Sequence, residues 1–198
     1  MYHDLVDCVF AIECDRNYLA DKHSIKNHIF KMEIERWRAT CVMYSSLRIY
    51  CMATNNIKMS CWWIFAKTMP ITMRKTSSVV SVLLGNQPSK YQQNLSRDPC
   101  ALCDYQGYDD NIHVLFDCDK LEPLRSRLYE KLTGSMPEAL SRHFREMSKD
   151  EKAALMLSGY GDAYIPEWSE LYFNTIDYVD SLYKLRSNLY DTLLIDNG

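Results

Sequence analysis

Three cysteines and one histidine lie close together near the middle of the chain, and their spacing restricts the local fold more than any other feature. Cys100, Cys103, His113 and Cys118 follow the pattern C-x2-C-x9-H-x4-C. A set of four thiolate and imidazole donors is what Zn²⁺ binds in a tetrahedral structural site. The spacing therefore predicts a small zinc finger with one Zn²⁺ ion and these four residues as its ligands.

The expected zinc is structural, because four protein donors leave no open coordination position for a substrate. Gly107 and several polar residues between Cys103 and His113 allow the chain to return to the second pair of ligands. Since this segment has few apolar residues, the metal would supply much of its folding free energy. We expect residues 114–116 to attach the finger to the following helix. The alternative is a reduced cysteine pair beside a histidine present by chance.

The remainder of the sequence favours a mainly α fold. Six Gly and six Pro among 198 residues are too few for a loop-rich or all-β chain, and a hydrophobic fraction of 47 % is enough for a core. A Ser-x-x-Glu capping box at Ser148 and Glu151 marks one helix start. We expect roughly six to eight helices with a small inserted Cys-Cys-His-Cys zinc finger. The clearest ranges are 21–50 (one or two helices), 61–67, 73–84, 120–132, 153–157 and about 167–194.

The chain divides by composition into four segments. They are an N-terminal helical segment (1–60), a basic, aromatic-containing helical segment (61–97), the zinc finger with its following helix (98–133) and a C-terminal helical segment (134–198). The last helix keeps an approximate heptad stripe from Trp168 to Leu193. Either core packing or a surface for a partner helix explains such a stripe.

No segment resembles a membrane span or a secretory signal. The longest apolar runs, 5–12 and 61–66, are far shorter than the ~20 residues that a bilayer requires. The first of them is flanked by acidic residues, whereas a secretory signal has a basic flank. The five cysteines outside the cluster are spread singly and are expected to be small core residues. We therefore expect an intracellular protein, nuclear or cytoplasmic, with no membrane association.

Charge is distributed unevenly along the chain. Residues 36–97 contain nine Lys or Arg and no Asp or Glu, whereas the segments on either side are acidic. Basic side chains neutralise phosphates, and aromatic faces stack on unpaired bases. This basic block is a candidate nucleic-acid surface, although packing against the acidic segments explains its charge equally well. The candidate contacts are Trp62, Trp63, Lys67, Arg74, Lys75, Lys90 and Arg97.

No catalytic pattern is complete in this sequence. Pro99-Cys100-x2-Cys103 matches one half of the zinc nucleobase-deaminase signature, but no upstream His-x-Glu supplies the other half. Tyr108-Asp109-Asp110 lacks the intervening residue of a polymerase Tyr-x-Asp-Asp motif and lies in the expected finger loop. Gly-x-Ser-x-Gly and Walker A patterns are absent. We expect no enzymatic activity.

Residues 95–132 resemble the C-terminal zinc-binding region of non-LTR (LINE-type) retrotransposon reverse transcriptases. The likeness lies in Cys100-x2-Cys103, followed by His113-Val-Leu-Phe-Asp-Cys118 and then x2-Leu121-x2-Leu124-Arg125. The resemblance implies a domain that helps such an enzyme hold its RNA template or target DNA. It implies no polymerase or endonuclease activity for this chain, because the motifs of those domains are missing.

Two functions follow as expectations. The first is a zinc-stabilised, non-catalytic nucleic-acid-binding accessory domain of retroelement origin, as a terminal fragment or remnant. Its partners would be RNA or DNA and the reverse-transcriptase core of a parent polyprotein. The second is a zinc-scaffolded protein-protein interaction module that uses the C-terminal helix. A copy without present function is a third possibility.

Overall fold

The computed structural model describes residues 22–43, 47–53, 60–86, 99–103, 105, 107, 109–161 and 163–196. These residues form helices and turns and contain no β-strand, which confirms the mainly α fold. The chain separates into two compact units, Met1–Thr40 and Cys41–Gly198. None of the helices within the described ranges has the length and hydropathy needed to cross a membrane.

Helix α2 (Lys22–Met43) accounts for most of the described part of the first unit. The range 21–50, expected to hold one or two helices, contains α2 and the start of the next helix. The helices of the second unit are α3 (Arg48–Ala53), α4 (Cys61–Thr68), α5 (Met73–Leu83), α6 (Glu122–Gly134), α7 (Glu138–Glu146), α8 (Lys149–Ser158) and α9 (Ser169–Asp196). Short turns lie at Pro70–Thr72, His113–Asp117, Asp119–Leu121 and Pro166–Trp168.

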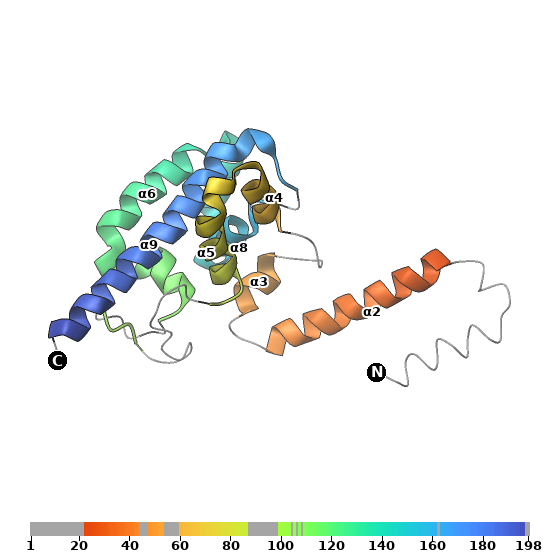
Figure 1. Cartoon of the computed structure of the whole chain (residues 1–198), viewed down its shortest axis with the longest axis horizontal. Helices are drawn as coiled ribbons and strands as arrows, with labels where there is room; N and C mark the ends of the chain where they lie inside the picture. Colours follow the sequence, from red (N-terminus) through yellow and green to blue (C-terminus); the bar gives the residue numbers. More distant parts are fainter. Residues whose placement is uncertain are drawn as a thin grey trace. The chain divides into compact units, whose positions relative to one another are not determined.

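The long helix α9 is the centre of the second unit. Helices α5 and α6 pack against it, α4 packs against α5, and α3 packs against α8 (Figure 1). Along its stripe, Leu171, Val179 and Leu182 are buried, whereas the stripe reaches solvent at its ends, Trp168 and Leu193. The core-packing interpretation of the heptad stripe therefore holds for most of its length.

Two local features define the ends of α8, and the sequence predicts the first of them. Ser148 Oγ accepts a hydrogen bond from the Glu151 backbone N–H at 3.3 Å, and the Glu151 carboxylate accepts from the Ser148 N–H at 2.8 Å. This is the expected capping box. At the other end, Gly159 has φ +87° and ends the helix in the left-handed conformation. An added Cβ there would lie 1.9 Å from Cys61 Sγ, so this close approach requires glycine.

Trp62 lies at the centre of an aromatic cluster. Its indole N–H donates to the Leu157 carbonyl at 2.6 Å, and its ring meets Tyr172 edge to face at 5.7 Å between centroids. Phe65 and Tyr164 complete the cluster around Tyr172. The side chain of Trp62 is 0 % exposed, so Trp62 belongs to the core.

Candidate metal centre

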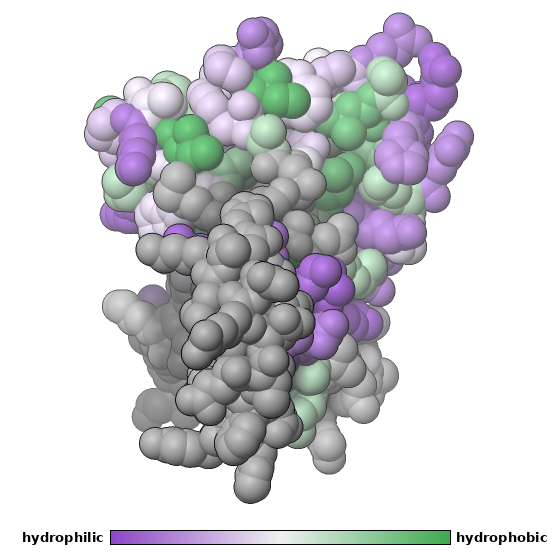
Figure 2. Space-filling model, turned by 90° about the vertical axis from the view of Figure 1, so that its right-hand side faces the viewer, coloured by the Kyte–Doolittle hydropathy of each residue, from purple (hydrophilic) through white to green (hydrophobic). Residues whose placement is uncertain are grey.

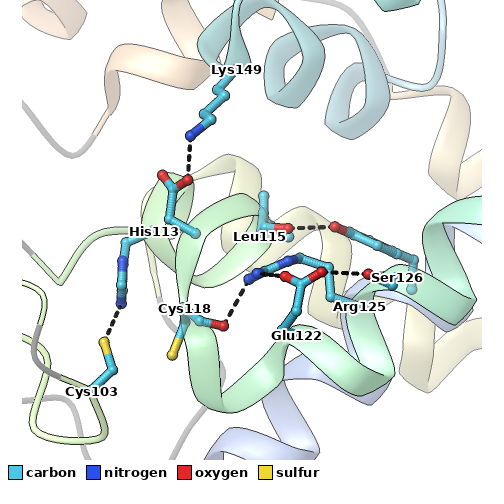
Figure 3. Close-up of polar contacts among 10 residues, drawn as sticks. Cys103, His113, Leu115, Cys118, Glu122, Arg125, Ser126 and Lys149 are labelled. Atoms are coloured by element: carbon cyan, nitrogen blue, oxygen red, sulfur yellow. Dashed lines mark hydrogen bonds and ion pairs between the residues drawn. The ribbon is translucent and has the colours of Figure 1, made fainter.

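The structure brings together the four side chains that the sequence singles out as ligands. Their donor atoms all lie within 4.8 Å of one another, and Cys103 Sγ is 3.4 Å from His113 Nε2 (Figure 3). Donors around a tetrahedral zinc ion are separated by about 3.5 to 3.8 Å, given zinc–sulfur bonds of about 2.3 Å and zinc–nitrogen bonds of about 2.0 Å. The cluster therefore needs only a small contraction to share one metal ion.

A π-helical turn explains why five positions separate the last two ligands. Residues His113–Asp117 form this turn, and the Cys118 N–H donates to the His113 carbonyl at 2.8 Å. An i→i+5 hydrogen bond closes one helical turn, so Cys118 follows His113 by one turn on nearly the same face. The start of the turn is held by Asp110 Oδ1, which accepts from the His113 N–H at 2.9 Å. The x4 spacing thus corresponds to a single unusual turn.

The apolar residues between these ligands anchor the turn in the core. Val114 and Leu115 are fully buried. The Leu115 carbonyl accepts a hydrogen bond from the Tyr178 hydroxyl of α9 (Figure 3). The turn packs against both α6 and α9. The expected attachment to the following helix is therefore present, and α9 adds a second one.

Cys118 is held by a buried arginine that sequence reasoning left without a role. Arg125 Nη1 donates to the Cys118 carbonyl at 2.9 Å, and its other terminal nitrogen pairs with Glu122 (Figure 3). Ser126 donates to the same carboxylate. The Arg125 side chain is only 8 % exposed, so its charge is mostly removed from water and depends on these acceptors. This arginine fixes the backbone of one ligand.

Burial differs among the four ligands. Cys100, His113 and Cys118 are buried, whereas Cys103 is half-buried. Hydrogen bonding to Cys118, followed by burial, raises the pKa of Cys100 to about 12. The same contact lowers the pKa of Cys118. A divalent cation displaces protons from such thiols, and its charge offsets the cost of burying thiolates.

His113 presents Nε2 to the cysteines, and its opposite edge is enclosed. The Tyr105 ring stacks on the imidazole with 4.4 Å between centroids and an interplanar angle of 11°. Nδ1 is buried and has no hydrogen-bond partner within the described ranges. Ligating histidines usually donate from this second nitrogen, so this one atom departs from the common pattern. The donor set, the separations and the burial nevertheless fit one structural Zn²⁺ ion.

The predicted nucleic-acid contacts separate into four groups. The prediction that Trp62 contacts nucleic acid is wrong, because a fully buried indole cannot stack on a base. Lys75 is engaged with Asp177 at 2.6 Å and lies over the Phe173 ring. Trp63, Lys67 and Arg74 are exposed. Lys90 and Arg97 lie outside the described residues.

On the face of the molecule shown in Figure 2, neither hydrophobic nor hydrophilic residues dominate among those that are coloured. Hydrophobic residues form separate green patches between hydrophilic ones. Exposed apolar side chains of α4, the turn after it and α5 include Trp63 (38 % exposed) and Ile71 (91 % exposed). Scattered exposed hydrophobic residues of this kind are normal for a folded protein.

Several residues that support the centre carry no local sequence signal. Asp109 pairs with Arg186, and Asn111 is bonded to Tyr183, although about seventy positions separate the partners. Amphipathic periodicity marks Arg186 and Tyr183 only as positions on a helix. Their partners become evident only when α9 is placed beside the turn.

Comparisons with known proteins identify no relative of this chain. A scan against models of protein families finds no match, and searches among curated proteins and solved structures find no significant similarity. What the site can do is therefore inferred from its own chemistry. Three sulfurs and one nitrogen can bind a divalent ion in a closed shell, which is the arrangement of structural sites.

Proposed function

We propose that this chain is a zinc-stabilised, non-catalytic domain in which Cys100, Cys103, His113 and Cys118 hold one Zn²⁺ ion. The observation that carries the proposal is the convergence of four soft or borderline donors from two separate stretches of backbone. Zinc prefers such donors to the oxygen ligands that Mg²⁺ and Ca²⁺ require. With four protein ligands the ion has no place for substrate, and its role is to stabilise the fold.

The ion would cross-link an irregular loop to a turn that is packed in the helical core. Residues 99–103 form an irregular loop, whereas His113 and Cys118 belong to a turn already packed against α6 and α9. Binding one ion to both parts would hold the loop on the helical core. This is the usual contribution of a structural metal to a segment with a small apolar surface.

We further propose that the domain serves as an accessory nucleic-acid-binding region of retroelement reverse-transcriptase origin. The resemblance over residues 95–132 supports this origin, and the basic block supports a polyanionic partner. Trp63, Lys67 and Arg74 are the described candidates with exposed side chains. The ligand would be RNA or DNA, bound mainly through its phosphates.

The alternative, a protein-protein interaction module using the C-terminal helix, has less support. Its surface would be the heptad stripe of α9, and that stripe is buried from Leu171 to Arg186. A helix cannot offer a partner the face that it packs against its own core. At the ends of the stripe, Trp168 is half-buried and Leu193 is 37 % exposed.

Metal analysis tests the first part of the proposal. We expect about one zinc per chain in the wild-type protein and a large loss in Cys103→Ala, because three donors bind zinc more weakly than four. Cys51→Ala is the matched control, since Cys51 is also half-buried but lies outside the cluster. A folded wild-type protein without metal would rule out the zinc site.

Salt-dependent binding tests the second part. The double variant Lys67→Ala/Arg74→Ala should weaken binding to single-stranded RNA or DNA and reduce the slope of log K against log salt by about 1.4, because two phosphate contacts are lost. Arg142→Ala/Arg145→Ala, which removes two exposed charges of α7 outside the basic block, is the control. Binding that does not respond to salt would contradict the proposal.

A further inference from the structure

Three side chains on one face of α9 reach the backbone segment that leads into His113. The Tyr183 hydroxyl donates to Asn111 Oδ1 at 2.6 Å, and Arg186 forms an ion pair with Asp109. The Tyr190 hydroxyl donates to the same Asp109 carboxylate at 3.1 Å. Positions i, i+3 and i+7 share one face of a helix, so a single stripe of α9 supplies all three donors.

The segment that receives these bonds is also held from the opposite side. The Asn111 Nδ2 group donates to the Val82 carbonyl at 3.0 Å, near the C-terminal end of α5. Asn111 therefore joins α5, α9 and the turn that carries His113. Its side chain is buried, as are Tyr183 and Arg186, so these bonds have little competition from water.

We propose that Tyr183, Arg186 and Tyr190 are positioning residues for the metal centre. The inference rests on the proposed zinc site and adds that the C-terminal half of α9 sets its affinity. Metal affinity is reduced by the free energy needed to order the ligands. Asp109 and Asn111 precede His113 by four and two residues, so bonds that hold them also restrict the imidazole.

The coupling must act in both directions. If contacts from α9 raise the affinity of the cluster for zinc, then zinc must stabilise those contacts by the same free energy. Bound zinc should accordingly slow hydrogen exchange in the α9 segment around residues 183–190. Helix α8 is less suitable as a reference, because Lys149 pairs with Asp117 in the turn between the ligands. Helix α4 is the internal reference, since its side-chain bonds to other elements within the described residues go to Leu157, Ser158, Gly159 and Tyr164 and not to the metal turn.

The first test is a pair of tyrosine variants of the full-length protein. Tyr183→Phe removes the hydroxyl that holds Asn111, whereas Tyr172→Phe removes the hydroxyl of another buried tyrosine of α9, which accepts from the Ile165 N–H at 3.1 Å in a part-buried position. Competition of Zn²⁺ between protein and a chromophoric chelator gives the affinity. We expect about a tenfold loss for Tyr183→Phe, at the lower end of the range for residues that orient metal ligands. Tyr172→Phe should stay within about twofold of the wild type, because its bond lies away from the centre.

The second test separates positioning from general destabilisation. Arg186→Met should weaken zinc binding by about tenfold or more, and Arg186→Lys should restore part of the loss, because lysine keeps the pair with Asp109. Bound Co²⁺ reports the ligand geometry by its visible spectrum, which a distant loss of stability leaves unchanged. Thermal unfolding identifies variants that are not folded, and Tyr190→Phe is the milder substitute if Arg186→Met is among them.

The outcomes distinguish this inference from the zinc site itself. Equal affinities for Tyr183→Phe and Tyr172→Phe, with zinc still bound, would overturn the positioning role and leave the site intact. Exchange in 183–190 that does not respond to zinc would also overturn it. A wild-type protein that takes up neither Zn²⁺ nor Co²⁺ would remove both.

Discussion

The aromatic core and the metal segment, residues 99–118, are held in place by different interactions. In the core, Trp62, Phe65 and Tyr172 are fully buried and contact one another, so the loss of one side chain affects many contacts. In the metal segment, Leu102, Val114 and Leu115 are the buried aliphatic side chains. The rest of that segment depends on polar bonds and on donors that converge on one point.

Because of this difference, we expect substitutions in the aromatic core to destabilise the whole unit and removal of the metal to destabilise mainly the metal segment. Burial of apolar surface is distributed and cooperative, so the core should unfold as a unit. Four ligands and a few buried hydrogen bonds form a local set, and removing their shared ion should release mainly the residues that supply them. The following experiments test this distinction.

The largest effect is expected from Trp62→Ala. Removing a fully buried indole leaves a cavity and an unpaired Leu157 carbonyl, and we expect a loss of about 3 to 5 kcal/mol in the free energy of unfolding. Chemical denaturation followed by circular dichroism measures it. Trp63→Ala is the matched control and should cost less than about 1 kcal/mol, because that side chain is 38 % exposed. Equal losses for the two variants would contradict the assignment of the core.

Removal of the metal should have the next largest effect, and it should be local. At free zinc about one hundred times the dissociation constant, chelation lowers the free energy of unfolding by about 2.7 kcal/mol. Hydrogen exchange should increase in the metal segment and much less in α4, which carries Trp62 and Phe65 of the aromatic core. The chelator should have no further effect on Cys103→Ala. An equal increase in α4 would show that the two regions are a single cooperative unit.

A smaller effect is expected where the core requires glycine. Gly159→Ala places a side chain in the left-handed conformation and against Cys61 Sγ, and it should cost about 2 kcal/mol. Thermal or chemical denaturation provides the measurement. Gly134→Ala, which has open space around the new Cβ, should leave stability unchanged or slightly higher. The double variant Gly159→Ala/Cys61→Ala should recover part of the lost stability, because the clash with Cys61 Sγ is removed. If it recovers none, the steric part of this explanation is wrong.

The smallest effect concerns the start of α8. Ser148→Ala removes the capping hydroxyl and should cost about 1 kcal/mol, whereas Ser148→Thr should restore most of that loss. Neither change should alter zinc affinity, since both leave Lys149 and its ion pair with Asp117 in place. A change in zinc affinity with Ser148→Ala would indicate that disorder at the start of α8 reaches the metal segment through this ion pair.

Much of the helical fold follows from local signals in the sequence. The capping box at Ser148, the glycine at the end of α8 and the long stripe of α9 all act over a few residues. Helix α7 lies outside the helical ranges expected from the sequence, although Leu140 and Phe144 lie four positions apart on its core-facing side. Its nine residues make only about two and a half turns, too few for this apolar spacing to stand out in the sequence.

The candidate site was predictable in part: its four ligands were, and the residues that support them were not. The four metal-binding positions lie close in sequence, and their spacing alone suggests that they meet. Adjacent residues such as Trp62 and Trp63 point in different directions, and composition cannot tell which of them faces the core. The bonds from Tyr183 and Arg186 depend on how α9 packs, which tertiary structure alone decides.

The π-helical turn from His113 to Asp117 contains one residue more than an α-helical turn needs. An α-helix also brings residues four positions apart to one face, so a chain that lacks one residue here would still place an imidazole beside a thiolate. A survey that demands a fixed x4 spacing would therefore miss chains in which the same four donors meet through an ordinary helical turn.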